Sequence, residues 1–351
     1  MNRSALIAIL ALLLIGQACN MKTEVQTKKT KTMEKTEEHY TFKLNENVTR
    51  QKVTFKNRFG ITLSGDLYLP TNSSKLNLPA IAISGPYGAV KEQSSGLYAN
   101  QMAARGFATL AFDPSYTGES GGEPRNISSP DINTEDFSAA VDFLGLHKAI
   151  DRNKIGILGI CGFGGYALNA AAPDKRIKAV ATSTMYDISR GTANGYYDSK
   201  TEEERTKEYV QIGEQRWKDA EKEKTSYGPT GLKNLPENAP QFVKEYAAYY
   251  TTSRGFHSRS LNSNGSWSLT NAVTNMNAPI LHYIKEISPR PILIIAGEKA
   301  HSKYFSETAF EAAVEPKELL IVPNAVHTDL YDQIDKIPFD KLESFFNENL
   351  N

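Results

Sequence analysis

One cysteine in the middle of the chain stands in a setting that could make it a nucleophile. Residues 155–166 run Ile-Gly-Ile-Leu-Gly-Ile-Cys-Gly-Phe-Gly-Gly-Tyr, an apolar stretch that passes through glycines into small residues. This order predicts a buried strand, a sharp turn that carries Cys161, and a helix whose N-terminus favours developing negative charge. Such a helix end would also lower the pKa of the thiol. We therefore expect Cys161 to attack a carbonyl carbon, the alternative being a buried, inert cysteine.

The turn around Cys161 departs from the usual pattern at one position. The residue two places after the nucleophile is normally small, and here it is Phe163. Shifting the frame by one residue would put Gly162 at the nucleophile position and leave no reactive side chain. We favour Cys161 because Gly159 then occupies its expected place.

Short apolar strands alternate with helical stretches on both sides of this segment. Strands are predicted at 53–55, 61–69, 80–83, 107–112, 154–158, 177–181, 291–295 and 318–322, and helices at 94–105, 137–147, 167–172, 306–313 and from 339. This alternation predicts an α/β fold, a mostly parallel sheet with helices on both faces. The rhythm breaks over about residues 187–288, where helical patterns at 201–223 and 241–251 indicate a helical cap insertion. Its tyrosines 196, 197, 246, 249 and 250 would contact a ligand or form the core of the cap.

Five stretches of the chain resemble the α/β-hydrolase superfamily, in the cysteine-nucleophile form found in dienelactone hydrolases and exported hydrolases of the YcjY type. The stretches are ISGPYGAVKEQSSGLYANQMA (83–103), AFDPSYTGESGGEPR (111–125), LGICGFGGYALNAA (158–171), AGEKAHSKYFSE (296–307) and VPNAVHTDLYD (322–332). The resemblance covers roughly residues 50–350, and it implies the α/β-hydrolase fold with Cys161 at the nucleophile position.

The resemblance also implies a general base and an acid. In this superfamily the histidine comes last, in a loop after the final strand, and His327 occupies that place. The acid usually follows the preceding strand, but Ala300 stands at its position. Glu298 is the nearest carboxylate and Asp187 is the alternative; either would orient the imidazole and stabilise the imidazolium.

Two backbone N–H groups would stabilise the oxyanion of the tetrahedral intermediate. One belongs to Gly162 and the other to the loop at residues 85–88. Since Pro86 has no N–H group, Tyr87 is the expected second donor.

The N-terminus has the features of an export signal. Arg3 precedes eleven apolar residues, too few to span a bilayer, and Gly16-Gln17-Ala18 precedes Cys19 in the manner of a signal-peptidase site. We expect residues 1–18 to be a signal peptide and Cys19 to carry lipid, although the usual leucine three places before it is missing. Residues 19–45 would then be a lipid-anchored flexible tether and 46–351 the hydrolase domain. The protein would be an exported cell-envelope lipoprotein, periplasmic or outer-membrane-associated, or otherwise secreted.

The composition narrows the class of function. The chain of 351 residues carries 40 Lys+Arg and 40 Asp+Glu, so a strongly basic nucleic-acid binder is not expected. The chain has two cysteines, and no two of its six histidines stand at the HxH or HxxxH spacing typical of metal ligands. We therefore expect no metal and no cofactor. The partner would be a small-molecule acyl substrate, with membrane contact only through the lipid.

We therefore expect an exported enzyme that cleaves an ester, thioester or activated amide through a Cys–His–acid triad and an acyl-enzyme. One alternative is an acyltransferase or peptidase that uses the same triad. A second is a non-catalytic, ligand-binding lipoprotein on a retired hydrolase fold, which Phe163 and Ala300 would favour.

Overall fold

The computed structural model describes residues 38–71, 77–230, 232–233 and 235–350. Contacts divide the chain into two units, Met1–Glu38 and His39–Asn351, and the account below concerns the second. The predicted signal peptide, Cys19 and most of the predicted tether lie outside the described residues. Among the described helices, none is both long enough and apolar enough to cross a membrane.

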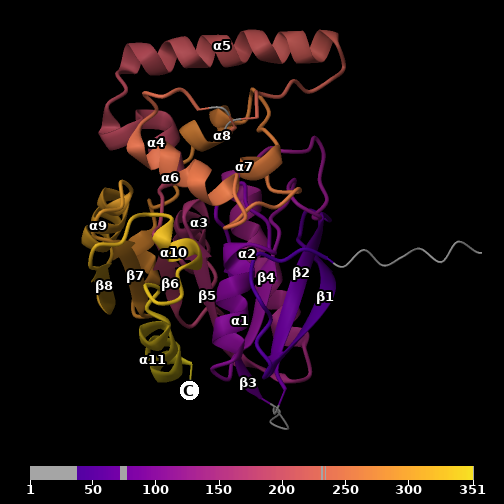
Figure 1. Ribbon diagram of the computed structural model, residues 1–351, viewed down its shortest axis with the longest axis vertical. Coiled ribbons are helices and arrows are strands. Elements are labelled where there is room, and N and C mark those ends of the chain that lie inside the picture. Colours follow the sequence, from indigo (N-terminus) through magenta and orange to yellow (C-terminus); the bar gives the residue numbers. More distant parts are fainter. Residues whose placement is uncertain (1–37, 72–76, 231, 234, 351) are drawn as a thin grey trace, which may run out of the picture. The chain divides into compact units, whose positions relative to one another are not determined.

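The core of the second unit is a mixed sheet in the order β1-β2-β4-β3-β5-β6-β7-β8. Strands β1 and β2 form an antiparallel hairpin, β2 pairs antiparallel with β4, and all later pairs are parallel. The strands are β1 Val48–Lys56, β2 Thr62–Pro70, β3 Leu78–Ser84, β4 Ala108–Phe112, β5 Ile150–Ile160, β6 Val180–Ser183, β7 Ile292–Gly297 and β8 Lys317–Val322. Figure 1 shows the sheet from β8 on the left to β1 on the right.

Helices cover both faces of the sheet, as the alternation of strands and helices predicts. They are α1 Ser94–Ala103, α2 Pro130–Leu146, α3 Gly162–Ala171, α9 Lys303–Ala312, α10 Asp329–Asp332 and α11 Phe339–Asn349. Side chains alternate along β3: Ala80 and Ala82 pack in the core with α2, α3 and α9, whereas Ile81 and Ile83 pack with α1 and α11. A strand buried on both faces must be apolar at every position, which explains the continuous apolar run.

The predicted elements are present, with ends that differ by a few residues. The largest difference is α2, which begins at Pro130 and not at the predicted residue 137. Proline is favoured in the first turn of a helix because its missing N–H group would have no helical partner there.

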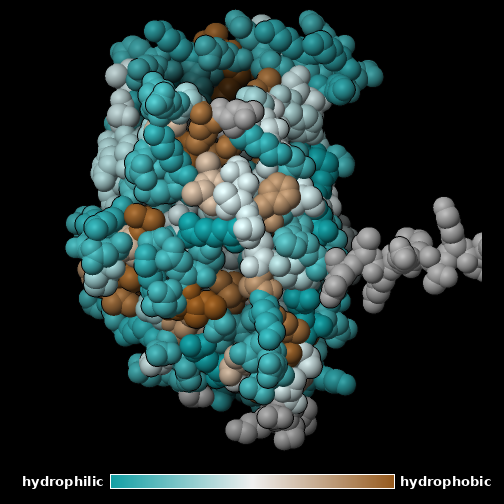
Figure 2. Space-filling model, in the orientation of Figure 1, coloured by the Kyte–Doolittle hydropathy of each residue, from teal (hydrophilic) through white to brown (hydrophobic). Residues whose placement is uncertain are grey.

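The long connection between β6 and β7 is helical. It contains α4 Ile188–Asn194, η1 Tyr196–Asp198, α5 Glu202–Glu221, α6 Gln241–Tyr250, α7 Leu261–Asn264, α8 Ala272–Met276 and η2 Ile284–Ile287. Figure 1 shows most of these helices above the ends of β5, β6 and β7. We call residues 187–288 the cap. Its helix α5 buries only Ile212, and Figure 2 shows hydrophobic side chains in a hollow beneath this mainly hydrophilic helix.

The segment before β1 corrects one predicted boundary. The N–H group of Thr41 donates to the carbonyl of Glu92 at 3.0 Å, and the N–H group of Asn45 donates to the side chain of Asn100 at 3.0 Å. Phe42 also packs against the core that α1 and α11 share. The packed domain therefore includes these residues, and a flexible tether as far as residue 45 is wrong. Phe42 and Leu44 supply the apolar surface that fixes this segment.

Two glycines should respond in opposite ways to the same substitution. A Cβ atom on Gly159 would lie 2.1 Å from the carbonyl oxygen of Phe163, so Gly159→Ala should lower the free energy of unfolding by about 3 kcal/mol. A Cβ atom on Gly213 in α5 would meet nothing within 4 Å, so Gly213→Ala should raise it by about 0.5–1 kcal/mol. Urea denaturation of both variants measures the difference, and a Gly159→Ala protein as stable as wild type would contradict the packing described.

Candidate active site

Cys161 occupies the sharp turn between β5 and α3. Its φ of 55° and ψ of −127° lie outside the usual regions for a residue with a side chain. Two backbone hydrogen bonds fix this conformation: the Cys161 N–H group donates to Ser183 at 3.0 Å, and its carbonyl accepts from Tyr186 at 2.9 Å. Gly162 is the first residue of α3. Cys161, and not Gly162, therefore occupies the turn between the strand and the helix.

The structure explains how the turn accommodates Phe163. This side chain is 2 % exposed and points into the core, where its ring lies 5.1 Å from that of Tyr166 and 6.2 Å from that of Phe137. The bulky residue therefore fills space beneath the turn and leaves the Cys161 thiol unobstructed.

The two predicted oxyanion donors lie beside the thiol. The backbone N–H groups of Tyr87 and Gly162 lie beside the Cys161 sulfur and favour its ionised form. A Cβ atom on Gly162 would lie 2.8 Å from the Cβ of Tyr87, so only glycine lets the two backbones approach this closely. The Tyr87 ring is held in turn by stacking on Trp267 at 4.2 Å.

His327 is completely buried, and hydroxyl groups surround it. Its Nδ1 atom lies 2.6 Å from the Ser302 hydroxyl and 2.9 Å from the Thr184 hydroxyl. Its Nε2 atom lies 2.9 Å from the hydroxyl of Tyr331. All hydrogen-bond partners found for this imidazole in the described structure are therefore uncharged.

Neither predicted acid lies against the imidazole, which corrects the expected triad. Glu298 is exposed and accepts a hydrogen bond from the Asn324 N–H group at 2.8 Å. Asp187 caps α4 by accepting from the Arg190 N–H group at 3.0 Å. Within the described residues, hydroxyls replace a carboxylate at Nδ1, and these hydroxyls come from the loops after β6 and β7.

Tyr331 lies between the cysteine and the histidine. Its hydroxyl lies 2.9 Å from His327 Nε2, and it also lies beside the Cys161 sulfur, whose ionised form it favours. Tyr331 belongs to α10, which begins two residues after His327, so the turn before the helix brings the two side chains together. That spacing in the sequence is the signal that could have identified Tyr331.

The protonation states of the pair differ from those expected from the sequence. Burial raises the pKa of the Cys161 thiol, and hydrogen bonds from Tyr331 and from the backbone of Tyr87 offset this only in part. Burial also lowers the pKa of His327 well below its usual value, and the neighbouring His301 lowers it further. The sequence predicted a lowered thiol pKa from the helix end; desolvation reverses that direction.

His301 is a second histidine of the site that the sequence analysis did not single out. Its ring centroid lies 5.0 Å from that of His327. Its Nε2 atom lies 2.9 Å from the Tyr186 hydroxyl and 3.3 Å from the Tyr246 hydroxyl. Burial lowers its pKa to about 4, so His301 is neutral at physiological pH.

The thiol opens into a cavity of about 320 Å³. Its lining residues are Tyr87, Cys161, Tyr186, Ile188, Leu232, Tyr246, Tyr250, Asn262 and Tyr331, none of which carries a charge at neutral pH. Two of the tyrosines that the sequence placed in the cap, Tyr246 and Tyr250, therefore face the cavity. Tyr249 is buried outside it, and Tyr196 and Tyr197 are exposed.

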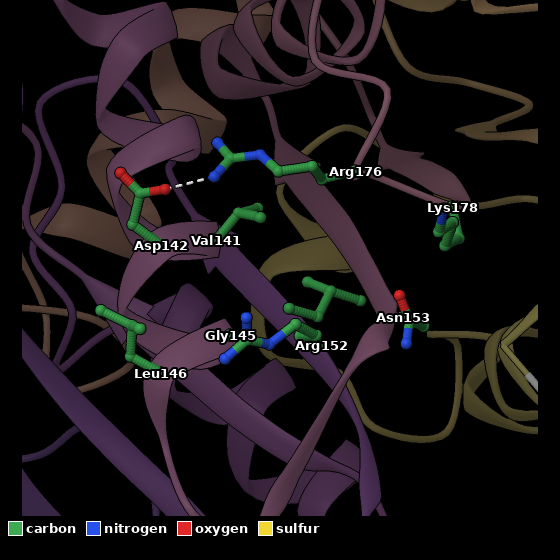
Figure 3. Close-up of a pocket in the computed structure, with 9 residues that line it drawn as sticks. Val141, Asp142, Gly145, Leu146, Arg152, Asn153, Arg176 and Lys178 are labelled. Atoms are coloured by element: carbon green, nitrogen blue, oxygen red, sulfur yellow. Dashed lines mark hydrogen bonds and ion pairs between the residues drawn. The ribbon is translucent and has the colours of Figure 1, made fainter.

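A second cavity of about 370 Å³ lies away from the thiol, beside α2 and β5 (Figure 3). Arg152, Lys178 and the ion pair between Asp142 and Arg176 line it. Figure 3 shows Asp142 and Arg176 turned toward each other, so each of these two charges has its counter-ion within the protein. No cysteine, serine or threonine lines this cavity.

Comparison with known proteins agrees with this geometry. Residues 60–283 match the X-Pro dipeptidyl-peptidase (S15) family. The chain is 62 % identical over 310 residues to protein PA2218 of Pseudomonas aeruginosa, covering 88 % of this chain and 83 % of that protein. It is 34 % identical to protein YcjY of Escherichia coli over 80 % of this chain and 92 % of that one.

Solved structures show the same fold. The crystal structure of PA2218 superposes with a TM-score of 0.87 at 58 % identity, covering 94 % of this chain and all of that one. The α/β-hydrolase GrgF from a Penicillium species superposes with a TM-score of 0.72 at 23 % identity, covering 86 % and 99 %. The eight-stranded sheet, the turn at Cys161 and these matches agree. The chain therefore belongs to the S15 family, and it is a hydrolase of the α/β-hydrolase fold.

Proposed function

We propose that this enzyme cleaves a carboxylic ester, a thioester or an activated amide through a covalent intermediate on Cys161. The observation that carries the proposal is the position of the Cys161 sulfur: two backbone N–H groups reach it, at the floor of an uncharged cavity. Backbone donors in this arrangement stabilise the negative charge that develops on a carbonyl oxygen. A buried structural cysteine would need neither the donors nor the cavity.

The reaction would run in two halves. The sulfur forms a bond to the acyl carbon while the thiol proton moves toward His327, and the carbonyl electron pair moves onto oxygen beside Tyr87 and Gly162. Collapse of this intermediate expels the alcohol or thiol with the proton from His327 and leaves an acyl thioester. Water then attacks the thioester, its proton passes to His327, and the C–S bond breaks as the sulfur regains a proton.

Thioesters are the favoured substrates among these classes. Charged groups are absent from the described hydrogen-bond partners of His327, so an imidazolium gains no ionic stabilisation. A thiol has a reference pKa of about 8.5 and can leave as a thiolate, so it depends less on protonation by a general acid than an alcohol does. Thiohydrolase aneE of Aspergillus aculeatus is 36 % identical over 39 % of this chain and 42 % of its own length. An uncharged cavity also gives no partner for the amino terminus of a peptide.

Acyl transfer is a second candidate. His327 is fully buried and Tyr331 covers its Nε2 atom, which restricts the access of bulk water to the base. Polyketide transferase claH of Penicillium crustosum is 33 % identical over 37 % of this chain and 42 % of its own length. Product analysis with added alcohol, thiol or amine acceptors separates transfer from hydrolysis.

The replacement of Cys161 tests the nucleophile. Cys161→Ala should lower kcat for p-nitrophenyl esters and for acyl thioesters by about a thousandfold or more, because no acyl-enzyme can form. Mass spectrometry of the quenched wild-type reaction should show the acyl group on the peptide that contains Cys161. An alanine variant with unimpaired turnover would contradict the mechanism, and a wild-type enzyme inert toward every ester and thioester would favour the ligand-binding alternative.

The pH dependence of alkylation tests the protonation state of the pair. A raised thiol pKa beside a neutral imidazole means that Cys161 is a thiol at pH 7 and ionises only at higher pH. The rate of reaction with iodoacetamide should therefore rise continuously from pH 6 to above pH 9, after subtraction of the rate of the Cys161→Ala variant. An inflection below pH 7 would indicate a thiolate–imidazolium pair and reject this description.

We also propose that the protein is exported and anchored through lipid on Cys19. The support is the apolar run after Arg3 and the small residues before Cys19. In a Gram-negative host, the mature wild-type protein should fractionate with membranes, and Cys19→Ala should move it to the soluble fraction because two acyl chains hold a protein far more tightly than none. Membrane association that survives this substitution would reject the anchor.

A further inference from the structure

We propose that the hydroxyl of Tyr331 carries the proton between the Cys161 sulfur and His327 Nε2, so that the reactive unit is a Cys161–Tyr331–His327 chain. This inference rests on the proposed role of Cys161 as nucleophile. It adds a catalytic residue, because Tyr331 contacts the reacting sulfur atom itself.

The first argument is the order of the hydrogen bonds. The Tyr331 hydroxyl lies 2.9 Å from His327 Nε2. Tyr331 and Cys161 also line the same cavity, where the hydroxyl lies close enough to the sulfur to favour its ionised form. In the described residues no hydrogen bond links the sulfur to the imidazole directly, and the second nitrogen, Nδ1, is occupied by Ser302 and Thr184. A proton that leaves the thiol for His327 therefore meets Tyr331 first.

The second argument is that the fold holds Tyr331 in position from both sides of its helix. Just before it, the carbonyl of Leu330 accepts from the Tyr98 hydroxyl at 2.7 Å. Just after it, Asp332 accepts two hydrogen bonds from Arg254 of the cap, at 2.7 and 2.8 Å. Paired contacts of this kind fix orientation, which proton transfer requires. Tyr331 is itself 0 % exposed, so bulk water does not compete for its hydroxyl.

The proton balance of the relay is complete. As the S–C bond forms, the thiol proton passes to the Tyr331 oxygen while the phenolic proton passes to His327 Nε2. Tyr331 therefore stays neutral throughout, which suits a phenol whose pKa burial raises well above its usual value. When the leaving group departs, Tyr331 passes its proton to the leaving group and takes back the proton held by His327, so the proton from His327 reaches the leaving group through Tyr331 and the sulfur stays acylated.

The variants Tyr331→Phe, His327→Gln and the double variant test the relay by the rate of Cys161 alkylation with iodoacetamide. If the residues act in series, each single variant should be at least about tenfold slower than wild type, and the double variant no slower than either. Alkylation at the wild-type rate in Tyr331→Phe would overturn the relay, as would losses that multiply in the double variant.

Tyr249→Phe is the matched control. Tyr249 is buried, it does not line the cavity into which the Cys161 thiol opens, and its ring lies 5.1 Å from that of Tyr331. The same chemical change should therefore leave alkylation at the wild-type rate. Tm and near-ultraviolet circular dichroism of every variant verify folding.

A second variant removes the whole ring. Tyr331→Ala leaves space for an added phenol, which should accelerate alkylation more than toluene does because only phenol can carry a proton. If phenol and toluene accelerate alkylation equally, the Tyr331 ring only fills space beside Cys161, and the relay is overturned. Alkylation requires no turnover, so relay-dependent alkylation in an enzyme inert toward esters would reject the proposed function and keep the relay.

Discussion

The close contact between the end of β5 and the start of α3 is the constraint on which the site depends. Gly159 lies so near the carbonyl oxygen of Phe163 that a single methyl group would separate the two segments. This contact holds Cys161 at a positive φ and directs its thiol to the carboxyl end of the sheet. The nearby N–H groups of Gly162 and Tyr87 and the cavity then follow, since the loop after β3 and the loop after β6 can both reach that point.

The site assembled there contains no charge at neutral pH, and this has a clear physical cause. Burial disfavours the charged form of every titratable group, and the neighbours of Cys161 and His327 are hydroxyls and aromatic rings. Charge would appear only during the reaction, as an oxyanion beside fixed N–H groups and a positive imidazole nearby. Opposite charges that form together in a low-dielectric site stabilise each other strongly. A neutral resting site is therefore compatible with catalysis, and it does not require the missing carboxylate.

Sequence patterns predicted the backbone of the site better than its side-chain contacts. The turn at Cys161, the positions of Gly162 and Tyr87 beside it and the place of His327 after the last strand follow from the order of strands and glycines along the chain. The partners of the imidazole do not, because Ser302 and Thr184 come from two loops that meet only in three dimensions. A rule based on chain order looks for a carboxylate and so selects Glu298.

The thiol pKa and the tether boundary were mispredicted for a related reason. A helix N-terminus lowers the pKa of a thiol only when it stabilises the thiolate more than burial destabilises it. The burial of Cys161 depends on a cap that lies far along the sequence. Likewise, Phe42 and Leu44 become part of a core only because α1 offers a surface beside them. Local composition around residues 40–45 contains no information about that surface.

Two parts of the chain, the sheet domain and the cap, line the cavity beside Cys161. Cys161, Tyr87 and Tyr331 come from the sheet domain. The other lining residues except Tyr186 come from the cap: Ile188, Leu232, Tyr246, Tyr250 and Asn262. Changes in the cap can therefore alter which acyl group fits without moving the thiol or its N–H donors. Arg254 is the exception, because this cap residue holds Asp332 beside Tyr331. Through that ion pair, the placement of the cap and the geometry of the proton path depend on each other.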